Sequence, residues 1–445
     1  MRNMIQCRQN LLQRRLFMRK LRVHTDRRHL ETEDGGRIYL LGDTAWELFH
    51  ALTREEAAYY LRTRQAQGFN MIQAVILAEL DGLETPNPYG RRPLLKNACG
   101  CYDPVLPDTG GGYSYFDHVE YIVSLAEELG LYMGMLPTWG DKYNRICGKG
   151  PEIFTEENAY AYGRWLGETF RHHDNILWIL GGDRPLDTEE HRRIIDAMAH
   201  GLRAGDGGRF LMTFHPCGAR SSSDYVHGRD WVDFHMMQSG HGYPSPWCFD
   251  MMAADYRKED FIPVMDGEPC YEDHPVNFQP EKGYFDAYDI RRAAMWNLFG
   301  GACGNTYGHH AVWQMRREPE TYCPNTWQVA LHRPGAAWIR IYRDFIRDND
   351  LTGFRPVYNI VEGNTHDCNY AAGMVSDAKA YLYIPCGIAV RLNLDVFPFV
   401  PSRAVLFDPA TGIYSGSAVR LTDDGRLSLP GRACGRGMDA VVILS

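Results

Sequence analysis

The 445-residue sequence contains no uninterrupted apolar run as long as a membrane-spanning helix, so we expect no membrane association. Residues 1–29 are basic and have no continuous apolar core, so we expect a short arm over residues 1–30 rather than a secretory signal. The 12 cysteines are scattered, and no second pair at zinc spacing accompanies Cys99 and Cys101, which favours free thiols. Together these absences predict a protein of the reducing cytoplasm.

Several catalytic signatures are also missing. There is no G-x-S-x-G, H-E-x-x-H or P-loop, which disfavours a serine hydrolase, a zinc protease and a nucleoside triphosphatase. The net charge of −9 gives the chain no general attraction for nucleic acid. We therefore expect no metal, no cofactor and no nucleic-acid partner, and a small molecule or an oligosaccharide as the substrate. The composition does not define an oligomeric state.

What the sequence does contain is an alternation of short apolar runs with amphipathic helical patterns, from about Arg37 to Tyr307. Alternating strands and helices predict a parallel sheet with crossover helices. The runs number about eight, which predicts an α/β fold, a (β/α)8 TIM barrel, over residues 31–350. A doubly wound sheet is the weaker alternative, because no G-x-G-x-x-G follows the first strand. The runs are RIYLLGD, NMIQAVIL, LYMGMLPTW, ILWILGGD, RFLMTFHP, VDFHMMQSG, IPVMDGE and GACGNTYG.

The last part of the chain has a different pattern. After a helical segment that begins at Pro334, period-two alternation dominates from about Val357, and Asp423 to Arg426 (DDGR) marks a hairpin turn. This pattern predicts a small antiparallel β-sandwich over residues 351–445. The linker of about eight residues is too short to free a module, so we expect the β-sandwich to pack on the outer face of the barrel.

Two carboxylates stand at the predicted carboxyl ends of barrel strands, where the chemistry of such barrels lies. Asp183 ends the fourth run and Glu268 ends the seventh. Two acids facing each other across a barrel mouth fit a retaining glycosidase, in which the carboxyl groups are about 5 Å apart. We therefore predict Asp183 as the general acid/base and Glu268 as the nucleophile. Strand-end acids also cap helices or pair with arginines, so spacing alone leaves the structural alternative open.

Asp266 is a rival to Glu268. Two residues apart on a strand they would point to the same side, and we expect Asp266 to orient other groups or to form a salt bridge. Polar and aromatic residues at the other strand ends are predicted to bind substrate: Asp43 (alternatively a helix cap), Trp46, Gln73, Trp139, Arg184, His215, Gln238, His241, Tyr307 and Trp313.

Long motifs also resemble a known family. The segment LGDTAWELFHALTREEAAYYLRTRQAQGFNMIQAVILAE resembles the opening of the apiosidase-like glycoside hydrolases of family 140. Further motifs follow in the same order as in that family: PNPYG, YFDHVEYIV, ILGGDRP, QSGHG, MDGEPCYED and GHHAVWQM. The resemblance covers most of residues 30–345. It implies a (β/α) barrel with the aspartate of GGD, Asp183, as acid/base and the glutamate of DGE, Glu268, as nucleophile.

The resemblance further implies release of the branched pentose apiose from plant glycans, notably pectic side chains. The tail resembles a small β domain often described as collagen-binding, although its FDPATG and MDAVVIL segments favour packing against the barrel. Without a secretion signal, imported oligosaccharides or small plant glycosides are the favoured substrates. Two alternatives stay open: the same chemistry on another pentose or a deoxyhexose, and a non-catalytic carbohydrate-binding protein.

Overall fold

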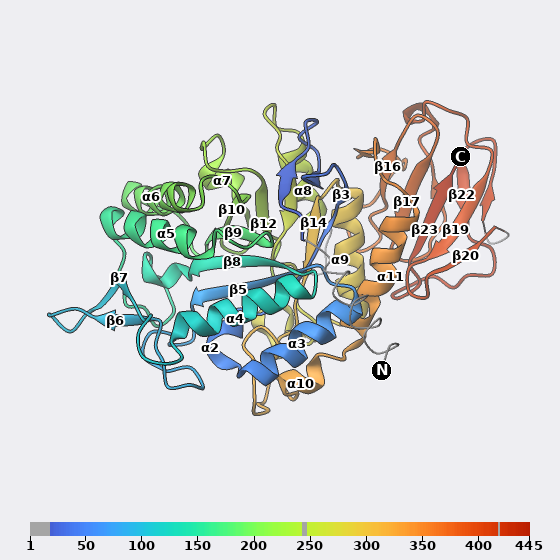
Figure 1. Ribbon diagram of the computed structural model, residues 1–445. Coiled ribbons are helices and arrows are strands. Elements are labelled where there is room, and N and C mark those ends of the chain that lie inside the picture. Colours follow the sequence, from blue (N-terminus) through green and yellow to red (C-terminus); the bar gives the residue numbers. More distant parts are fainter. Residues whose placement is uncertain (1–17, 243–246, 417–418) are drawn as a thin grey trace, which may run out of the picture.

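The eight apolar runs form eight parallel strands of one sheet. The computed structural model describes residues 18–242, 247–416 and 419–445. The strands follow one another around the sheet in sequence order, and the last pairs with the first. Figure 1 shows part of this order, with β5, β8 and β9 side by side. They are β4 (Leu40–Thr44), β5 (Met71–Leu77), β8 (Tyr132–Thr138), β9 (Ile176–Gly181), β10 (Met212–His215), β12 (His235–Gln238), β13 (Val264–Asp266) and β14 (Gly304–Tyr307). This confirms the strand content of the predicted barrel.

The ring is nearly closed. Between β10 and β12 the backbone N–H of Asp233 donates to the carbonyl oxygen of Met212 at 2.9 Å, and the hydroxyl of Thr213 donates to the carbonyl of Phe234 at 2.6 Å. A ninth, short strand, β11 (Arg220–Ser221), pairs antiparallel with β12. The observed architecture is therefore a nearly closed, mostly parallel barrel of nine strands, with one strand more than the pattern predicts.

Helices surround this barrel. The longer ones are α3 (Arg54–Gln67), α4 (Tyr115–Glu128), α5 (Glu156–Phe170), α6 (Glu189–Asp206), α8 (Trp247–Tyr256), α9 (Ala287–Phe299) and α11 (Pro334–Asp348). Short elements are α2 (Leu48–Ala51), α7 (Ser223–Val226), α10 (Trp327–Ala330) and the hairpin β6 (Leu94–Lys96) and β7 (Tyr102–Pro107). The α3 helix starts with a complete capping box of Thr53 and Glu56. Among the described helices, none has the length and apolarity needed to cross a bilayer.

A small antiparallel sheet covers the amino-terminal end of the barrel. It consists of β1 (Leu21–Val23), β2 (Leu30–Thr32) and β3 (Arg37–Ile38). Leu21 and Leu30 belong to the same buried cluster as Leu40 and Met71, which stand at the beginnings of barrel strands. The sequence pattern did not predict this sheet, which overlaps the end of the predicted arm. Residues 1–17 of that arm lie outside the described residues.

The chain ends in an antiparallel β domain of two sheets. The larger sheet has the order β15 (Arg355–Val357), β16 (Ala372–Val375), β17 (Ala380–Ile384), β23 (Ala440–Leu444), β19 (Ala404–Asp408) and β20 (Ile413–Ser415). The smaller sheet contains β18 (Val390–Arg391), β22 (Arg426–Ser428) and β21 (Arg420–Leu421). The predicted turn at Asp423–Arg426 joins β21 and β22, with Gly425 at a φ of 79°. This confirms the antiparallel pattern.

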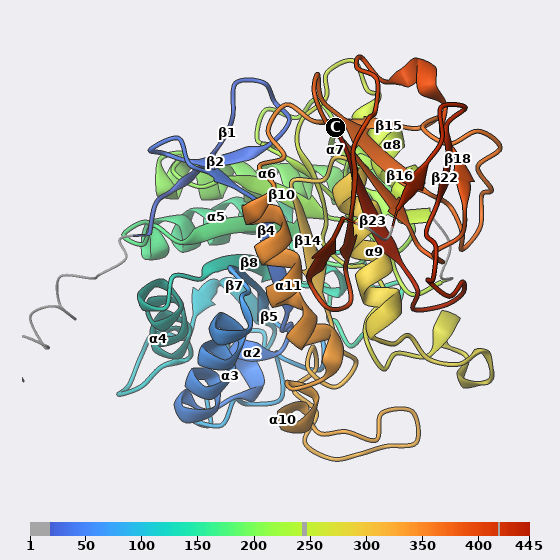
Figure 2. The same cartoon turned by 90° about the vertical axis from the view of Figure 1, so that its right-hand side faces the viewer.

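The β domain packs directly on the barrel. One face of the larger sheet contributes Tyr381, Tyr383 and Val441 to a buried cluster that also contains residues of α9 and α11, and Figure 2 shows these helices beside β23. Arg291 of α9 forms a buried ion pair with Asp439, with an Nη2–Oδ1 distance of 2.8 Å. The expected apolar contact with the outer face of the barrel is therefore present, with a buried charge pair within it.

Candidate active site

The turn after β9 is left-handed over three consecutive residues. Gly181, Gly182 and Asp183 have φ angles of 91°, 114° and 54°. A Cβ on Gly182 would lie 2.8 Å from the ring of Trp139, so this position requires glycine for steric as well as conformational reasons. Asp183 is a non-glycine residue in the same region, a strained conformation that is concentrated at functional sites. The two glycines of GGD thus let the chain turn sharply and place Asp183 at the barrel mouth.

Glu268 lies two residues beyond β13, in a buried position between two histidines. Nε2 of His215 is 3.2 Å from Oε2 of Glu268, and Nε2 of His241 is 3.1 Å from Oε1. Burial raises the pKa of this carboxyl, but the contacts with both histidines outweigh burial and hold its pKa below the ordinary value. Glu268 is therefore ionised at neutral pH, which is the form that can act as a nucleophile.

Asp183 has the opposite electrostatic environment. Burial and the negative charge of Glu268 raise its pKa above the ordinary value, and they outweigh the effects of Arg184 and His215. Nη1 of Arg184 donates to Oδ2 of Asp183 at 2.9 Å. The Asp183 side chain is 36% exposed and that of Glu268 only 8%. One acid is thus accessible and more readily protonated, while the other is enclosed and ionised, as a pair with divided acid and nucleophile roles requires.

His215 connects the two acids and forms part of an aromatic cluster. The backbone N–H of Asp183 lies 3.4 Å from its Nδ1, while its Nε2 faces Glu268. The rings of Trp46 and Trp139 lie 5.4 Å and 5.9 Å from the ring of His215, and 5.1 Å from each other. Trp313 packs against the same cluster from the loop after β14. The structure thus brings these predicted aromatic residues together beside the acids.

Several buried polar atoms around the acids have no protein partner. Among them are Oε1 of Gln73, Nε1 of Trp139, Oε1 of Gln238 and Nδ1 of His241. Gln73 is fixed through its Nε2, which donates to the carbonyl of Gly267 at 2.8 Å, and the side chain of Gln238 stabilises the charged form of Asp183. Buried polar atoms are normally hydrogen-bonded, so unpaired ones in a mouth favour a ligand rich in hydroxyl groups.

Asp266 does not share the orientation of Glu268, which corrects the expectation. The strand ends at Asp266, so the two-residue period does not extend to Glu268. Oδ2 of Asp266 accepts hydrogen bonds from the hydroxyl of Ser239 at 2.6 Å and from Nδ2 of Asn297 at 2.9 Å. Burial raises the pKa of Asp266 to about 6. Asp266 therefore orients the chain between β12 and His241, as expected of an orienting acid, and it accepts from amide and hydroxyl groups of Ser239 and Asn297.

Two predicted substrate contacts lie elsewhere. Asp43 is fully buried and its Oδ2 accepts from Nε of Arg64 on α3 at 2.7 Å, so it points to the helix layer. Tyr307 is also buried, and its hydroxyl donates to Glu272 at 2.7 Å. The prediction that these two side chains bind substrate needs correction, because Asp43 joins β4 to α3 and Tyr307 joins β14, through Glu272, to the backbone N–H of Gly335 on α11. Neither side chain is accessible at the mouth.

Three residues near the acids were not among the predicted site residues. Glu79 follows β5, and its Oε1 lies 3.5 Å from Nη2 of Arg184; burial raises its pKa to about 7. Tyr271 and His274 follow Glu268, and their rings lie 4.5 Å and 4.3 Å from the ring of His241. All three occupy loops that follow barrel strands, and this position is the signal by which they could have been found.

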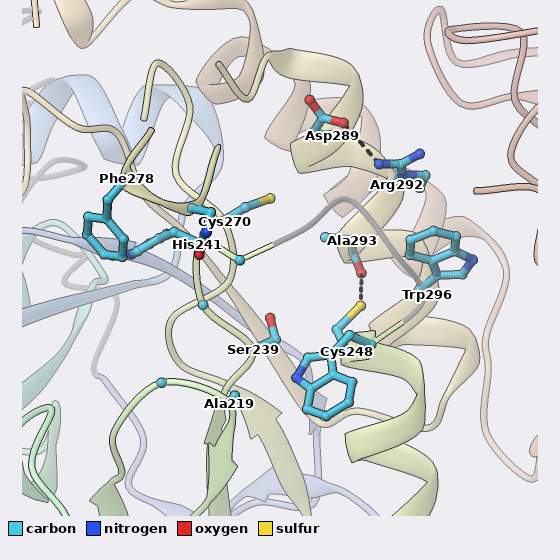
Figure 3. A pocket seen from close by; sticks show the side chains of 15 residues that line it. Ala219, Ser239, His241, Cys248, Cys270, Phe278, Asp289, Arg292, Ala293 and Trp296 are labelled. Carbon is cyan, nitrogen blue, oxygen red and sulfur yellow. Dashed lines mark hydrogen bonds and ion pairs between the residues drawn. The ribbon is translucent and has the colours of Figure 1, made fainter. Parts of the chain in front are cut away.

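A cavity of about 430 Å³ lies beside His241. Figure 3 shows His241 and Phe278 on one side and Arg292 and Trp296 of α9 on the other. Neither Asp183 nor Glu268 lines this cavity. The cavity is therefore a neighbour of the acid pair that shares one histidine with it. The two groups of histidines and carboxylates in the described residues that converge at metal-ligand distances also lack any residue of the mouth.

Comparison with known proteins identifies a family. Residues 24–352 match the model of the family described as apiosidase-like, catalytic domain. No curated protein gives a match.

Solved structures show the same architecture over nearly the whole chain. A glycoside hydrolase family 5 structure from Bacteroides vulgatus ATCC 8482 is 27% identical, with a TM-score of 0.83, covering 96% of this chain and 93% of that one. A second structure, described as a glycoside hydrolase, is 26% identical with a TM-score of 0.83, covering 96% of both chains. The match over residues 24–352 shows that the chain belongs to the apiosidase-like catalytic domain family, and its fold is that of glycoside hydrolases.

Proposed function

We propose that this protein is a retaining glycoside hydrolase of the apiosidase-like family 140 and that it releases apiose from plant-derived apiosides or pectic oligosaccharides. The observation that carries the proposal is the pair of strand-end acids with pKa values displaced in opposite directions. Burial and the charge of Glu268 raise the pKa of Asp183, whereas His215 and His241 hold that of Glu268 low. This division supports an acid/base role for Asp183 and a nucleophilic role for Glu268.

In the first step, a carboxylate oxygen of Glu268 attacks the anomeric carbon and forms a covalent ester with the sugar. The bond between that carbon and the leaving oxygen breaks, and Asp183 donates its proton to this oxygen. In the second step, ionised Asp183 takes a proton from water, which attacks the same carbon and releases the sugar from Glu268. The two attacks occur on opposite faces, so the sugar keeps its original configuration.

The other mouth residues are proposed to bind the sugar. The unpaired polar atoms of Gln73, Trp139, Gln238 and His241 can exchange hydrogen bonds with hydroxyl groups. The rings of Trp46 and Trp139 offer apolar faces to C–H groups of the sugar. Arg184 holds Asp183 at the rim. The combination suits a small, polar, non-ionic ligand.

We further propose that the enzyme works in the cytoplasm on small glycosides or imported oligosaccharides. The cysteines in the described part of the chain are free thiols, and several of them are exposed, such as Cys99, Cys101 and Cys434. Exposed free thiols suit a reducing compartment. We propose that residues 31–350 form the catalytic unit and that residues 351–445 stabilise it through the contact with α9 and α11.

A release screen tests the proposal. The purified protein is incubated with plant apiosides, pectic oligosaccharides and a set of aryl glycosides, and the free monosaccharides are identified by chromatography. A double variant, Asp183→Ala with Glu268→Ala, serves as the control. We expect apiose from the wild type and none from the variant. Release of another pentose or a deoxyhexose would refute the sugar assignment. Binding of these glycosides without release of a monosaccharide from any of them would refute the proposed glycosidase activity.

A further inference from the structure

A cluster of histidines and glutamates joins α4 to the turn that precedes β9. Glu120 lies on α4, and His172 and His173 lie in the turn after α5. Oε1 of Glu120 is 3.1 Å from Nε2 of His172 and 3.0 Å from Nε2 of His173. The ligand atoms of these three residues all lie within 4.8 Å of one another. Three potential metal ligands from two separate segments therefore converge on one point.

The opposite nitrogen of each ring is held by an acceptor. Nδ1 of His173 lies 2.8 Å from Oε2 of Glu127, which is also on α4. Nδ1 of His172 lies 3.1 Å from the carbonyl oxygen of Thr169. A carbonyl and a carboxylate both accept, so each Nδ1 carries a hydrogen and each Nε2 faces Glu120. In neutral rings these Nε2 atoms would present lone pairs to the carboxylate of Glu120, and either a proton or a metal cation between them removes that repulsion.

The dimensions fit a transition-metal ion. Bonds of about 2.0–2.1 Å at tetrahedral angles place ligand atoms about 3.3 Å apart, close to the 3.1 and 3.0 Å that separate Oε1 of Glu120 from the two Nε2 atoms. A carboxylate that fixes the far nitrogen of a ligating histidine is a recurrent partner in zinc sites. We propose that His172, His173 and Glu120 bind a divalent transition-metal ion of the zinc type, with Glu127 orienting His173. Two imidazoles favour zinc over calcium or magnesium, which prefer oxygen ligands.

Charge also supports such a site. Two neutral histidines with the carboxylates of Glu120 and Glu127 carry a net charge of −2, which one divalent cation neutralises.

The site lies away from the acid pair. His172 and His173 precede β9, whereas Asp183 follows its end, and six residues of strand span about 20 Å. At this distance, a metal ion bound by the cluster would not contact the substrate. It would clamp α4 to the start of β9, at the end of the barrel that serves stability. The expected effect is therefore on unfolding rather than on turnover.

The test uses the full-length protein after treatment with a chelator. Isothermal titration with Zn²⁺ and visible absorption with Co²⁺ are measured for the wild type and for His172→Ala, in which an exposed ligand is removed. His200→Ala, which removes another exposed histidine paired with a carboxylate (Asp230), is the matched control. A second variant, Glu127→Gln, tests the orienting residue.

We expect the wild type and His200→Ala to bind Zn²⁺ alike, with a tetrahedral Co²⁺ spectrum and a higher melting temperature on addition of Zn²⁺. His172→Ala should lose one equivalent of tight binding and that thermal shift, and Glu127→Gln should bind about 10–100-fold more weakly. Initial rates on an aryl glycoside should not change in His172→Ala. Absence of Zn²⁺ binding in the wild type, or unchanged binding in His172→Ala, would overturn the proposal and leave an ion-paired histidine cluster.

Discussion

Replacing His241 by alanine should narrow the pH range in which the enzyme is active. The Nε2 atom of His241 lies 3.1 Å from Oε1 of Glu268, and this contact helps to keep the pKa of Glu268 low. A nucleophilic carboxylate is active only when ionised, so activity is lost as the pH falls through its pKa. Without His241 that pKa rises, and the loss begins at a higher pH.

The size of the effect follows from the lost contact. A hydrogen bond to a charged group contributes about 1.5–3 kcal/mol, and one pKa unit corresponds to about 1.4 kcal/mol. Removing one of the two histidines should therefore move the acidic limb of the kcat/KM profile upward by about 1–2 pH units. His215 remains in place, so the shift should be partial. The alkaline limb, to which Asp183 contributes, should move much less.

The assay is kcat/KM on an aryl glycoside between about pH 3 and pH 9. The control is His200→Ala, a surface change that should leave both limbs in place. Thermal unfolding of each variant establishes that the fold is intact. A folded His241→Ala variant with the same acidic limb as the wild type would show that this limb does not report the ionisation of Glu268. The assignment of Glu268 as the nucleophile would then lose its electrostatic support.

Four further predictions concern other parts of the structure. Asp183→Ala should reduce hydrolysis of natural glycosides by about 10²-fold or more but spare aryl glycosides with activated leaving groups, and equal losses on both would contradict an acid role. Asp439→Ala leaves Arg291 buried without its partner, so urea unfolding should show that the free energy of unfolding falls by about 3–5 kcal/mol. Removal of the residues after Asp350 should give unstable protein, and a soluble, fully active truncation would refute the stabilising role of the β domain. Gly182→Ala forces a Cβ toward the Trp139 ring and should lower kcat/KM by about 10²-fold, whereas an unchanged rate would show that the turn tolerates a side chain.

The barrel could be predicted because its signal is local. Strands of a parallel sheet are buried on both faces, and β5 and β8 are apolar enough in sequence to be recognised as such. The acid pair followed from the rule that chemistry lies at the carboxyl ends of the strands. The sequence showed two glycines before Asp183, and the structure adds the conformational reason for them, which is the left-handed backbone of the Gly181–Asp183 turn.

The same burial explains the failures. In β4 both faces are buried, so the sequence alone did not reveal that Asp43 points to Arg64 rather than to the mouth. The same reason explains the wrong prediction for Tyr307, because β14 is also buried throughout and the sequence did not reveal that this side chain points to Glu272. The early end of β13 changed the relative orientation of Asp266 and Glu268. The sheet formed by β1, β2 and β3 depends on contacts with distant strand ends, which no local pattern records.

The retaining mechanism is tested most directly by the configuration of the azide products of two variants. Asp183→Ala and Glu268→Ala are incubated with an activated aryl glycoside and sodium azide, and the glycosyl azides are examined by NMR. We expect a product of retained configuration from Asp183→Ala, because azide attacks the ester on Glu268. From Glu268→Ala we expect an inverted product, because azide attacks the substrate itself. An inverted azide from Asp266→Ala in place of Glu268→Ala, or sugar of inverted configuration from the wild type, would contradict it.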